Sequence, residues 1–171
     1  TPDWQLAFNN LWLKLKKKKY ELKVPLKNQP KGDRDHLATV FDEVTDLSRI
    51  LEILKITNRA DFEVALAEAN IRSFASIDTV RTSYQKGPFL LDLDQAKFPL
   101  LKTGQIYHYA VAEIELQTTP ELVPQARKDI ITFAEQHGLE VTDTRGKLME
   151  FVFQNYPDVY AEFVKRGLIS S

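Results

Sequence analysis

Residues 107–116, YHYAVAEIEL, alternate in a way that permits few structures other than a β-strand. Side chains of a strand point to opposite faces with a period of two, so Glu113 and Glu115 share one face and Ile114 lies on the other. Neighbouring carboxylates repel each other and raise each other's pKa. Such a pair is expected where the function of the protein requires two acidic groups side by side.

The same alternation recurs in four other segments, which predicts an antiparallel sheet: residues 11–16, 20–24, 76–85 and 89–94. Each segment has one apolar face, and the opposite face is charged in most of them. The charges segregate by sign: basic residues occur on the first three segments and acidic residues on the fourth, namely Lys14, Lys16, Lys23, Arg81, Asp92 and Asp94.

Two arrangements fit these faces. In an ordinary sandwich, the charged faces would lie in solvent. In a curved sheet, helices would cover the apolar face and the charged face would line an interior. The second arrangement suits a polyanion bridged by a divalent metal, because carboxylates without Cys or His prefer hard cations such as Mg²⁺ or Mn²⁺.

Helices and turns fill the intervals between the strands. Apolar spacing predicts short helices over residues 46–54 and 59–67, a longer one from Thr119 to Gly138, and two more separated near Pro157. The lysines at 17–19 are expected to form a polar hairpin turn, KGP at 86–88 to break the chain between strands, and residues 29–36 to form a loop.

The composition excludes several kinds of site and argues against several classes of protein. The 171 residues contain no cysteine, which excludes disulfides and thiolate zinc sites, and the three histidines lack metal-ligand spacing. No apolar run or signal-peptide pattern predicts membrane insertion or export, so a cytoplasmic protein is expected. The first 34 residues hold nine Lys or Arg against three Asp or Glu. Their interleaving with apolar residues argues against a nucleic-acid patch.

Five segments occur in the order found in the CYTH superfamily of triphosphate tunnel metalloenzymes: WLKLKKKKYELK, VRTSY, LLDLDQAKF, YAVAEIEL and RGKLMEFV. The chain resembles this superfamily over essentially its whole length, as one domain over residues 1–171. YELKVP, DEVT and the closing KLMEFVFQNYPDVYAEF resemble its thiamine-triphosphatase branch. The resemblance implies an α+β fold, in which an antiparallel β-barrel forms a tunnel with helices packed outside.

The resemblance also implies roles for individual residues. Asp92, Glu113 and Glu115 match metal ligands. The family's phosphate-binding positions correspond to Lys14, Lys16, Lys23, Arg81 and Lys147. Its catalytic positions correspond to Lys23 and Glu43. Lys14 and Lys16 stand where the family often has arginine, and lysine cannot form a bidentate fork with phosphate.

One hallmark of the family is absent, the ExExK strand. TPDW resembles the segment after the family's second strand, so the first two strands are expected to be missing. A fragment of a longer gene is the favoured explanation, and a truncated inactive paralogue is the alternative.

The function expected from the resemblance is Mg²⁺- or Mn²⁺-dependent hydrolysis of a small-molecule triphosphate, with thiamine triphosphate and inorganic tripolyphosphate favoured. The alternatives are a phosphate-binding module without turnover and a nucleotide cyclase. We expect no nucleic-acid or membrane partner, and a monomer or a weak homodimer.

Overall fold

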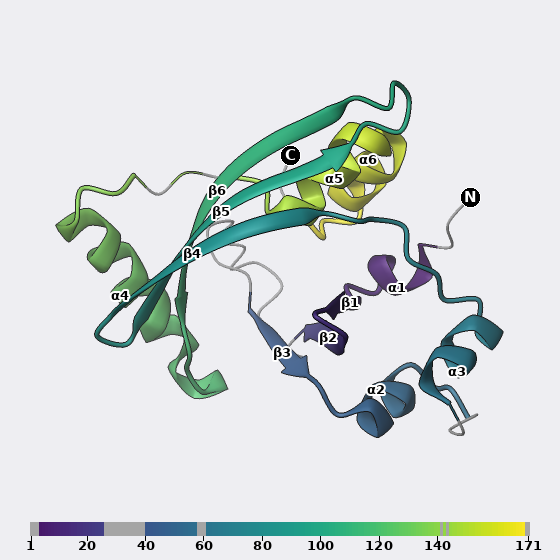
Figure 1. Cartoon of the computed structure of the whole chain (residues 1–171). Helices are drawn as coiled ribbons and strands as arrows, with labels where there is room; N and C mark the ends of the chain where they lie inside the picture. The colour runs from purple at the N-terminus through teal and green to yellow at the C-terminus, as the bar shows by residue number, and fades with distance from the viewer. Residues whose placement is uncertain (1–3, 26–39, 58–60, 141, 143, 170–171) are drawn as a thin grey trace. The chain divides into compact units, whose positions relative to one another are not determined.

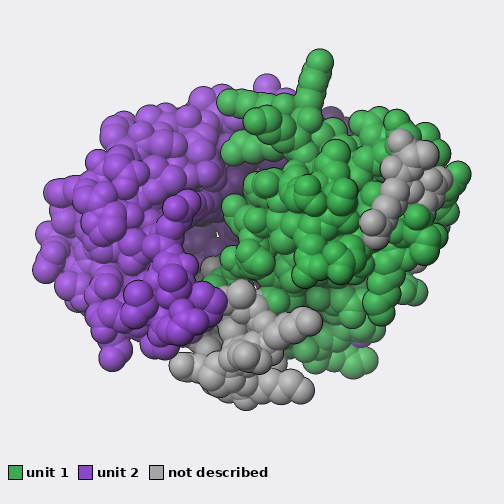
Figure 2. Space-filling view, turned by 90° about the horizontal axis from the view of Figure 1, so that it is seen from below, with its two compact units in different colours: residues 1–34, 39–74, 165–171 green, residues 35–38, 75–164 purple. Residues whose placement is uncertain are grey.

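The computed structural model describes residues 4–25, 40–57, 61–140, 142 and 144–169 (Figure 1). The predicted loop at 29–36 lies outside these residues. The chain divides into two compact units, which Figure 2 colours separately: residues 1–34, 39–74 and 165–171 form unit 1, and residues 35–38 and 75–164 form unit 2.

Unit 1 contains a three-stranded antiparallel sheet in the order β1-β2-β3 and three short helices. The elements are α1 (Gln5–Phe8), β1 (Trp12–Lys16), β2 (Lys19–Pro25), β3 (Phe41–Val44), α2 (Leu47–Ile53) and α3 (Phe62–Glu68). Lys17 and Lys18 both have positive φ, which matches the two-residue turn that suits the twist of a hairpin. The predicted hairpin is confirmed, whereas α1 and β3 were not anticipated.

The helices of unit 1 begin and end with local signals. Asp46 and Asp61 cap α2 and α3, since each carboxylate accepts a hydrogen bond from the backbone N–H three residues on. Leu22 at the centre of β2 is fully buried, as is Ile50 of α2. The apolar face of this sheet therefore belongs to the core of the unit.

Unit 2 contains a second three-stranded antiparallel sheet, in the order β4-β5-β6, followed by helices. Its elements are β4 (Asp78–Lys86), β5 (Phe89–Pro99), β6 (Ile106–Leu116), the 3₁₀ turn η1 (Pro120–Leu122), α4 (Val123–Gln136), α5 (Lys147–Asn155) and α6 (Pro157–Lys165). Gly87, with φ of +56°, allows the tight turn between β4 and β5. The predicted strands, the break at KGP and the helix division near Pro157 are confirmed.

Helices α4 and α5 contact opposite faces of this sheet. On α4, Phe133 stacks on Phe89 at 4.3 Å between ring centroids. On α5, Phe151 packs edge-on against Phe98 at 5.2 Å. Because Phe89 is odd-numbered and Phe98 even-numbered in the same strand, the two helices lie on different sides of β5.

The predicted closed barrel is not observed among the described strands. The α+β class and the antiparallel pairing are confirmed, but the hydrogen-bond ladders form two separate sheets of three strands each. Closure into a barrel requires every strand to have two neighbours, and the described part of β4 and of β6 pairs only with β5. No helix in the described part of the chain is long and apolar enough to span a membrane.

Both faces of β5 are covered in part, since α4 packs on Phe89 of the apolar face and the acidic face is buried as well. Asp92 and Asp94 are 1% and 2% exposed, and Leu93 on the other face is 40% exposed. Ala96 and Phe98 follow on the same face of β5 and are also buried, and Phe151 of α5 packs on Phe98. Burial of the two carboxylates is possible because cationic side chains reach them, as described below.

Candidate active site

Four carboxylates share one face of the sheet in unit 2. Asp92 pairs with Glu113 across β5 and β6, and Asp94 lies two residues further along β5 on the same side. Glu115 follows Glu113 along β6. The strand register therefore places these side chains together although β5 and β6 are separated by a connecting turn in the sequence.

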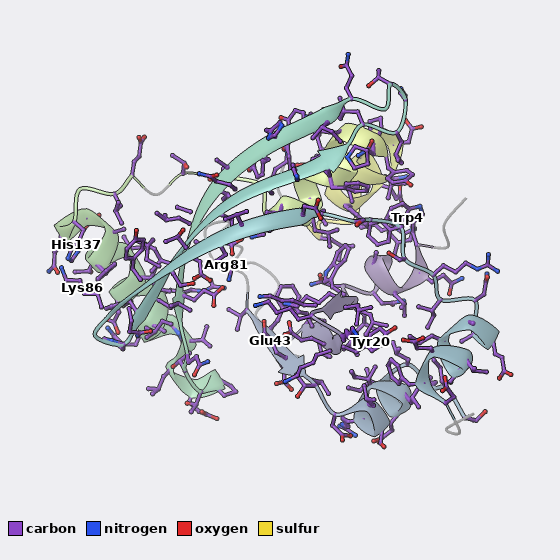
Figure 3. All side chains as sticks on the ribbon, in the orientation of Figure 1. Trp4, Tyr20, Glu43, Arg81, Lys86 and His137 are labelled. Atoms are coloured by element: carbon purple, nitrogen blue, oxygen red, sulfur yellow. The ribbon has the colours of Figure 1, made fainter. Side chains whose placement is uncertain are left out.

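Arg81 on β4 is directed into this group, and Figure 3 labels it. Its guanidinium makes a two-pronged contact with Asp94, Nε to Oδ1 and Nη2 to Oδ2, both at 2.7 Å. Nη1 also donates to Asp92, and Nη2 donates to Glu113 Oε2 at 3.0 Å. Glu115 Oε1 lies 3.9 Å from Nη1. One side chain thus holds acidic groups from two strands.

Lys147 approaches the same group from α5. As the first residue of that helix, it donates a hydrogen bond to Glu113 Oε1 at 2.8 Å and forms an ion pair with Asp94. Its side chain is only 18% exposed, so a normally solvated ammonium has been drawn into the protein. The predicted phosphate-binding residues Arg81 and Lys147 are therefore in contact with the predicted metal ligands Asp92 and Glu113.

A buried network anchors α5 and so positions Lys147. Glu150, one turn further along the helix, is 3% exposed. Its carboxylate accepts hydrogen bonds from Arg145 Nη1 at 3.0 Å and from the Tyr107 hydroxyl of β6 at 3.1 Å. The bond to Tyr107 joins the first turn of α5 to the strand that carries Glu113.

Asp94 is a site residue that the resemblance to the family does not include among the metal ligands. It lies in the middle of β5, where Arg81 and Lys147 both bind it. The hydrogen bonds from Arg81, helped by Lys147 and opposed by burial, lower its pKa to about 2. The signal was present in the sequence, because Asp92 and Asp94 are two residues apart and must share a face. Ser83 was also missed; its hydroxyl donates to Asp92 Oδ1 at 2.6 Å.

The acidic excess at this site suits a divalent cation. Four carboxylates face the two cationic groups of Arg81 and Lys147, so negative charge is left over. All the candidate metal ligands are carboxylate oxygens, which hard cations prefer. In the arrangement observed, no three Asp, Glu or His side chains among the described residues are grouped so as to hold a metal ion. Arg81 and Lys147 occupy the space between the carboxylates instead.

A second group of predicted residues lies on one face of the sheet in unit 1. Lys23 pairs with Glu43 across β2 and β3, with Nζ 3.0 Å from Oε1, and Lys14 forms an ion pair with Glu21. The strand register puts Lys14, Lys16, Lys23 and Glu43 on the same side. This face carries an excess of positive charge.

The lysines of this group affect the pKa of Glu43. Burial raises its pKa, but the hydrogen bond from Lys23 and the charges of Lys23, Lys14 and Lys16 outweigh that effect, and the net pKa is lowered. Lys14 and Lys16 are therefore close enough to influence Glu43, as expected for side chains on one face.

Comparison with models of known protein families shows which family the chain belongs to. A family model for the CYTH domain matches residues 1–146. The chain belongs to the CYTH domain family. The match includes strands of both sheets and the residues Arg81, Asp92, Glu113 and Glu115, and it ends just before Lys147.

The acidic and basic residues of the site are consistent with membership of the CYTH family. The family contains enzymes and binding proteins that act on triphosphates, including triphosphatases and cyclases, and its tunnel enzymes generally depend on divalent metal. A search of curated proteins found no match to this chain.

Proposed function

We propose that this CYTH protein hydrolyses the triphosphate group of a small molecule with the help of Mg²⁺ or Mn²⁺. Thiamine triphosphate and inorganic tripolyphosphate are the substrates we favour. The observation that carries the proposal is the convergence of Arg81 and Lys147 on Asp92, Asp94 and Glu113, from a strand and a helix, in a chain of this family.

The contacts suggest how substrate would bind. Guanidinium and ammonium groups that are bonded to carboxylates can exchange them for phosphate oxygens, which are also anionic and accept the same hydrogen bonds. Arg81 is a stronger candidate than Lys147 for binding phosphate, because its planar guanidinium already makes a bidentate contact with Asp94. Lys147 would supply a second, single-point contact.

Exchange of this kind would release the acidic residues. Asp92, Glu113 and Glu115 would then be available to hold the cation. Glu115 is the most accessible of the three, with its side chain 52% exposed. When bound, the metal would neutralise phosphate charge and stabilise the oxygen that departs. The residues of the chain would hold the triphosphate in line with a water molecule that attacks its terminal phosphorus.

Under this proposal, the basic face of the sheet in unit 1 also binds phosphate. Lys14, Lys16 and Lys23 would attract the anion, and Glu43 would orient Lys23 through their ion pair. We assign Lys23 and Glu43 catalytic roles by their match to the family pattern.

The test is phosphate release from thiamine triphosphate and from tripolyphosphate, with Mg²⁺ and with a chelator. The proposal predicts Mg²⁺-dependent release that is strongly reduced in Arg81→Ala. Binding of tripolyphosphate without release would instead identify a phosphate-binding module. Formation of a cyclic nucleotide from ATP would identify a cyclase.

A further inference from the structure

Glu150 of α5 is a buried carboxylate that the proposed mechanism does not use. It is 3% exposed. Arg145 Nη1 donates to its Oε2 at 3.0 Å, and the Tyr107 hydroxyl and Gln154 Nε2 donate to its Oε1 at 3.1 and 2.8 Å. A buried charge is costly even when it is paired, and an apolar residue would fill the same space at lower cost. The geometry that these contacts fix therefore explains them better than a contribution to stability does.

Arg145, the partner of Glu150, is held from three elements of unit 2. Its guanidinium carbon lies 3.9 Å from the centroid of the Phe153 ring of α5. Its Nε donates to the Tyr160 hydroxyl of α6 at 3.1 Å. The Tyr109 hydroxyl of β6 donates to its backbone carbonyl at 2.5 Å. Both the side chain and the backbone of Arg145 are thus fixed immediately before α5 begins.

The ion pair between Arg145 and Glu150 spans the start of α5. Gly146 occupies the N-cap position and offers no side chain to cap the helix, so Lys147 is the first residue of a helix without a side-chain cap. Helix ends of this kind leave backbone N–H groups unsatisfied and tend to fray. The Arg145–Glu150 pair closes the first turn from two residues before Lys147 to three residues after it. The pair therefore fixes the backbone of a lysine that would otherwise lie at a frayed end.

Strand β6 holds this pair and also receives the ammonium of Lys147. Tyr107, Tyr109 and Glu113 share one face of the strand, because they are separated by even numbers of residues. The two tyrosines donate to the two members of the Arg145–Glu150 pair, and Glu113 Oε1 accepts from Lys147 Nζ at 2.8 Å. A lysine side chain is flexible, and an ordered one has less freedom to lose when a ligand binds. One rigid surface thus fixes the stem of Lys147 and the direction of its ammonium.

We propose that Tyr107, Arg145 and Glu150 are positioning residues, which hold Lys147 where its ammonium meets a phosphate of the substrate. The proposal rests on the proposed function, because it takes Lys147 as a phosphate-binding residue. All the contacts that carry it lie within unit 2. Arg145 binds no phosphate in this account, although it is a cation two residues from Lys147, because its guanidinium is committed to Glu150 and the aromatic rings.

Tyr107→Phe tests the role of the network with little disturbance of packing. It removes one hydrogen bond from Glu150 and keeps the ring that packs against Phe98, with centroids 5.3 Å apart. Binding of tripolyphosphate, measured by calorimetry in metal-free buffer, should weaken roughly threefold or more. In the Lys147→Met background the same substitution should leave the affinity unchanged, because the residue that it positions is gone. Tyr84→Phe, at a 55% exposed position on the other face of the sheet, is the matched control and should bind like wild type.

Arg145→Met distinguishes positioning from direct contact with phosphate. If Arg145 binds phosphate itself, its loss weakens binding by the same factor with and without Lys147. If it acts by positioning, its effect disappears in the Lys147→Met background. Circular dichroism shows whether each variant is folded, and Tyr107→Phe alone decides between the two roles of the network if Arg145→Met does not fold.

A second measurement needs no ligand. The ammonium of Lys147 is bonded to Glu113 and paired with Asp94, so its protons should exchange slowly with water. NMR correlation of lysine ammonium nitrogen and hydrogen detects such a group, and its absence from the Lys147→Met spectrum identifies the signal. Tyr107→Phe should speed the exchange roughly threefold or more, because the ammonium is less firmly held. Tyr84→Phe should leave the rate unchanged.

Two results would overturn the positioning role: an equal loss of affinity from Tyr107→Phe with and without Lys147, or an exchange rate that Tyr107→Phe does not alter. A wild-type chain that binds no tripolyphosphate would contradict the proposed function instead. The exchange rate of the Lys147 ammonium would then still decide whether the network positions this side chain.

Discussion

Lys147 Nζ donates a hydrogen bond to Glu113 Oε1 at 2.8 Å, which joins the first residue of α5 to the middle of β6. The bond connects a helix lysine to one of the two neighbouring glutamates of YHYAVAEIEL. It shows that the repulsion expected between Glu113 and Glu115 is relieved by cations from other elements. The site is thus held together before any ligand binds.

Replacement of Lys147 by Met should weaken the binding of tripolyphosphate by roughly ten- to a hundredfold, because one charge-assisted contact is worth roughly 1.5–3 kcal/mol. Methionine keeps the apolar stem, so packing of α5 is retained. Isothermal titration calorimetry measures the affinity. Lys128→Met, which removes a lysine of α4, is the control and should bind like wild type. An equal loss in both variants would show a non-specific charge effect.

Arg81→Lys keeps the charge and removes the fork. Lysine offers one point of contact where Arg81 makes two bonds to Asp94. The pKa of Asp94 should rise from about 2 toward its ordinary value of 3.8. Carboxyl chemical shifts followed by NMR against pH report the change. Arg49→Lys, at an exposed helical ion pair with Glu52, should leave the pKa of Asp94 unchanged.

The lowered pKa of Asp94 also predicts how stability depends on pH. Its folded pKa lies below its unfolded value, so the stabilisation is complete above pH 5 and is lost as pH falls toward 2. The difference corresponds to about 2 kcal/mol in the free energy of unfolding. Urea unfolding at successive pH values measures it, and Asp94→Asn should show a shallower loss between pH 5 and 2. Identical slopes would contradict this role for Asp94.

In unit 1, Lys23→Met should raise the pKa of Glu43. The hydrogen bond and charge of Lys23 lower that pKa, and burial, which raises it, would remain after the substitution. NMR titration of the Glu43 carboxyl provides the measurement. Lys19→Met is a suitable control, since Lys19 lies at the far end of β2 from Glu43. A Glu43 pKa that does not move in Lys23→Met would exclude the coupling.

Period-two alternation predicted most strands and which residues share a face. Lys14, Lys16 and Lys23 lie together for that reason, and so do Arg81, Asp92, Glu113 and Glu115. Alternation does not say which face the rest of the chain will cover. The burial of Asp92 and Asp94 depends on Arg81 and Lys147, which come from other elements.

Some features depend on contacts between residues distant in sequence. Lys147 is an ordinary helix lysine by its local pattern, and only its match to the family indicated the site. The strand at Phe41–Val44 is short, and pairing with β2 defines it. Closure of a barrel likewise depends on partners for every edge, which local alternation cannot supply.

The central proposal is that the carboxylates of β5 and β6 serve a divalent metal during triphosphate hydrolysis. The most direct test compares Mg²⁺-dependent phosphate release by wild type and by Glu113→Gln/Glu115→Gln, with circular dichroism to show that both are folded. Glu121→Gln/Glu135→Gln, which removes two exposed carboxylates elsewhere in unit 2, is the matched control. We predict that the control retains wild-type activity and that the Glu113/Glu115 variant loses Mg²⁺-dependent release while remaining folded. Undiminished Mg²⁺-dependent release by the folded Glu113/Glu115 variant would contradict the proposal.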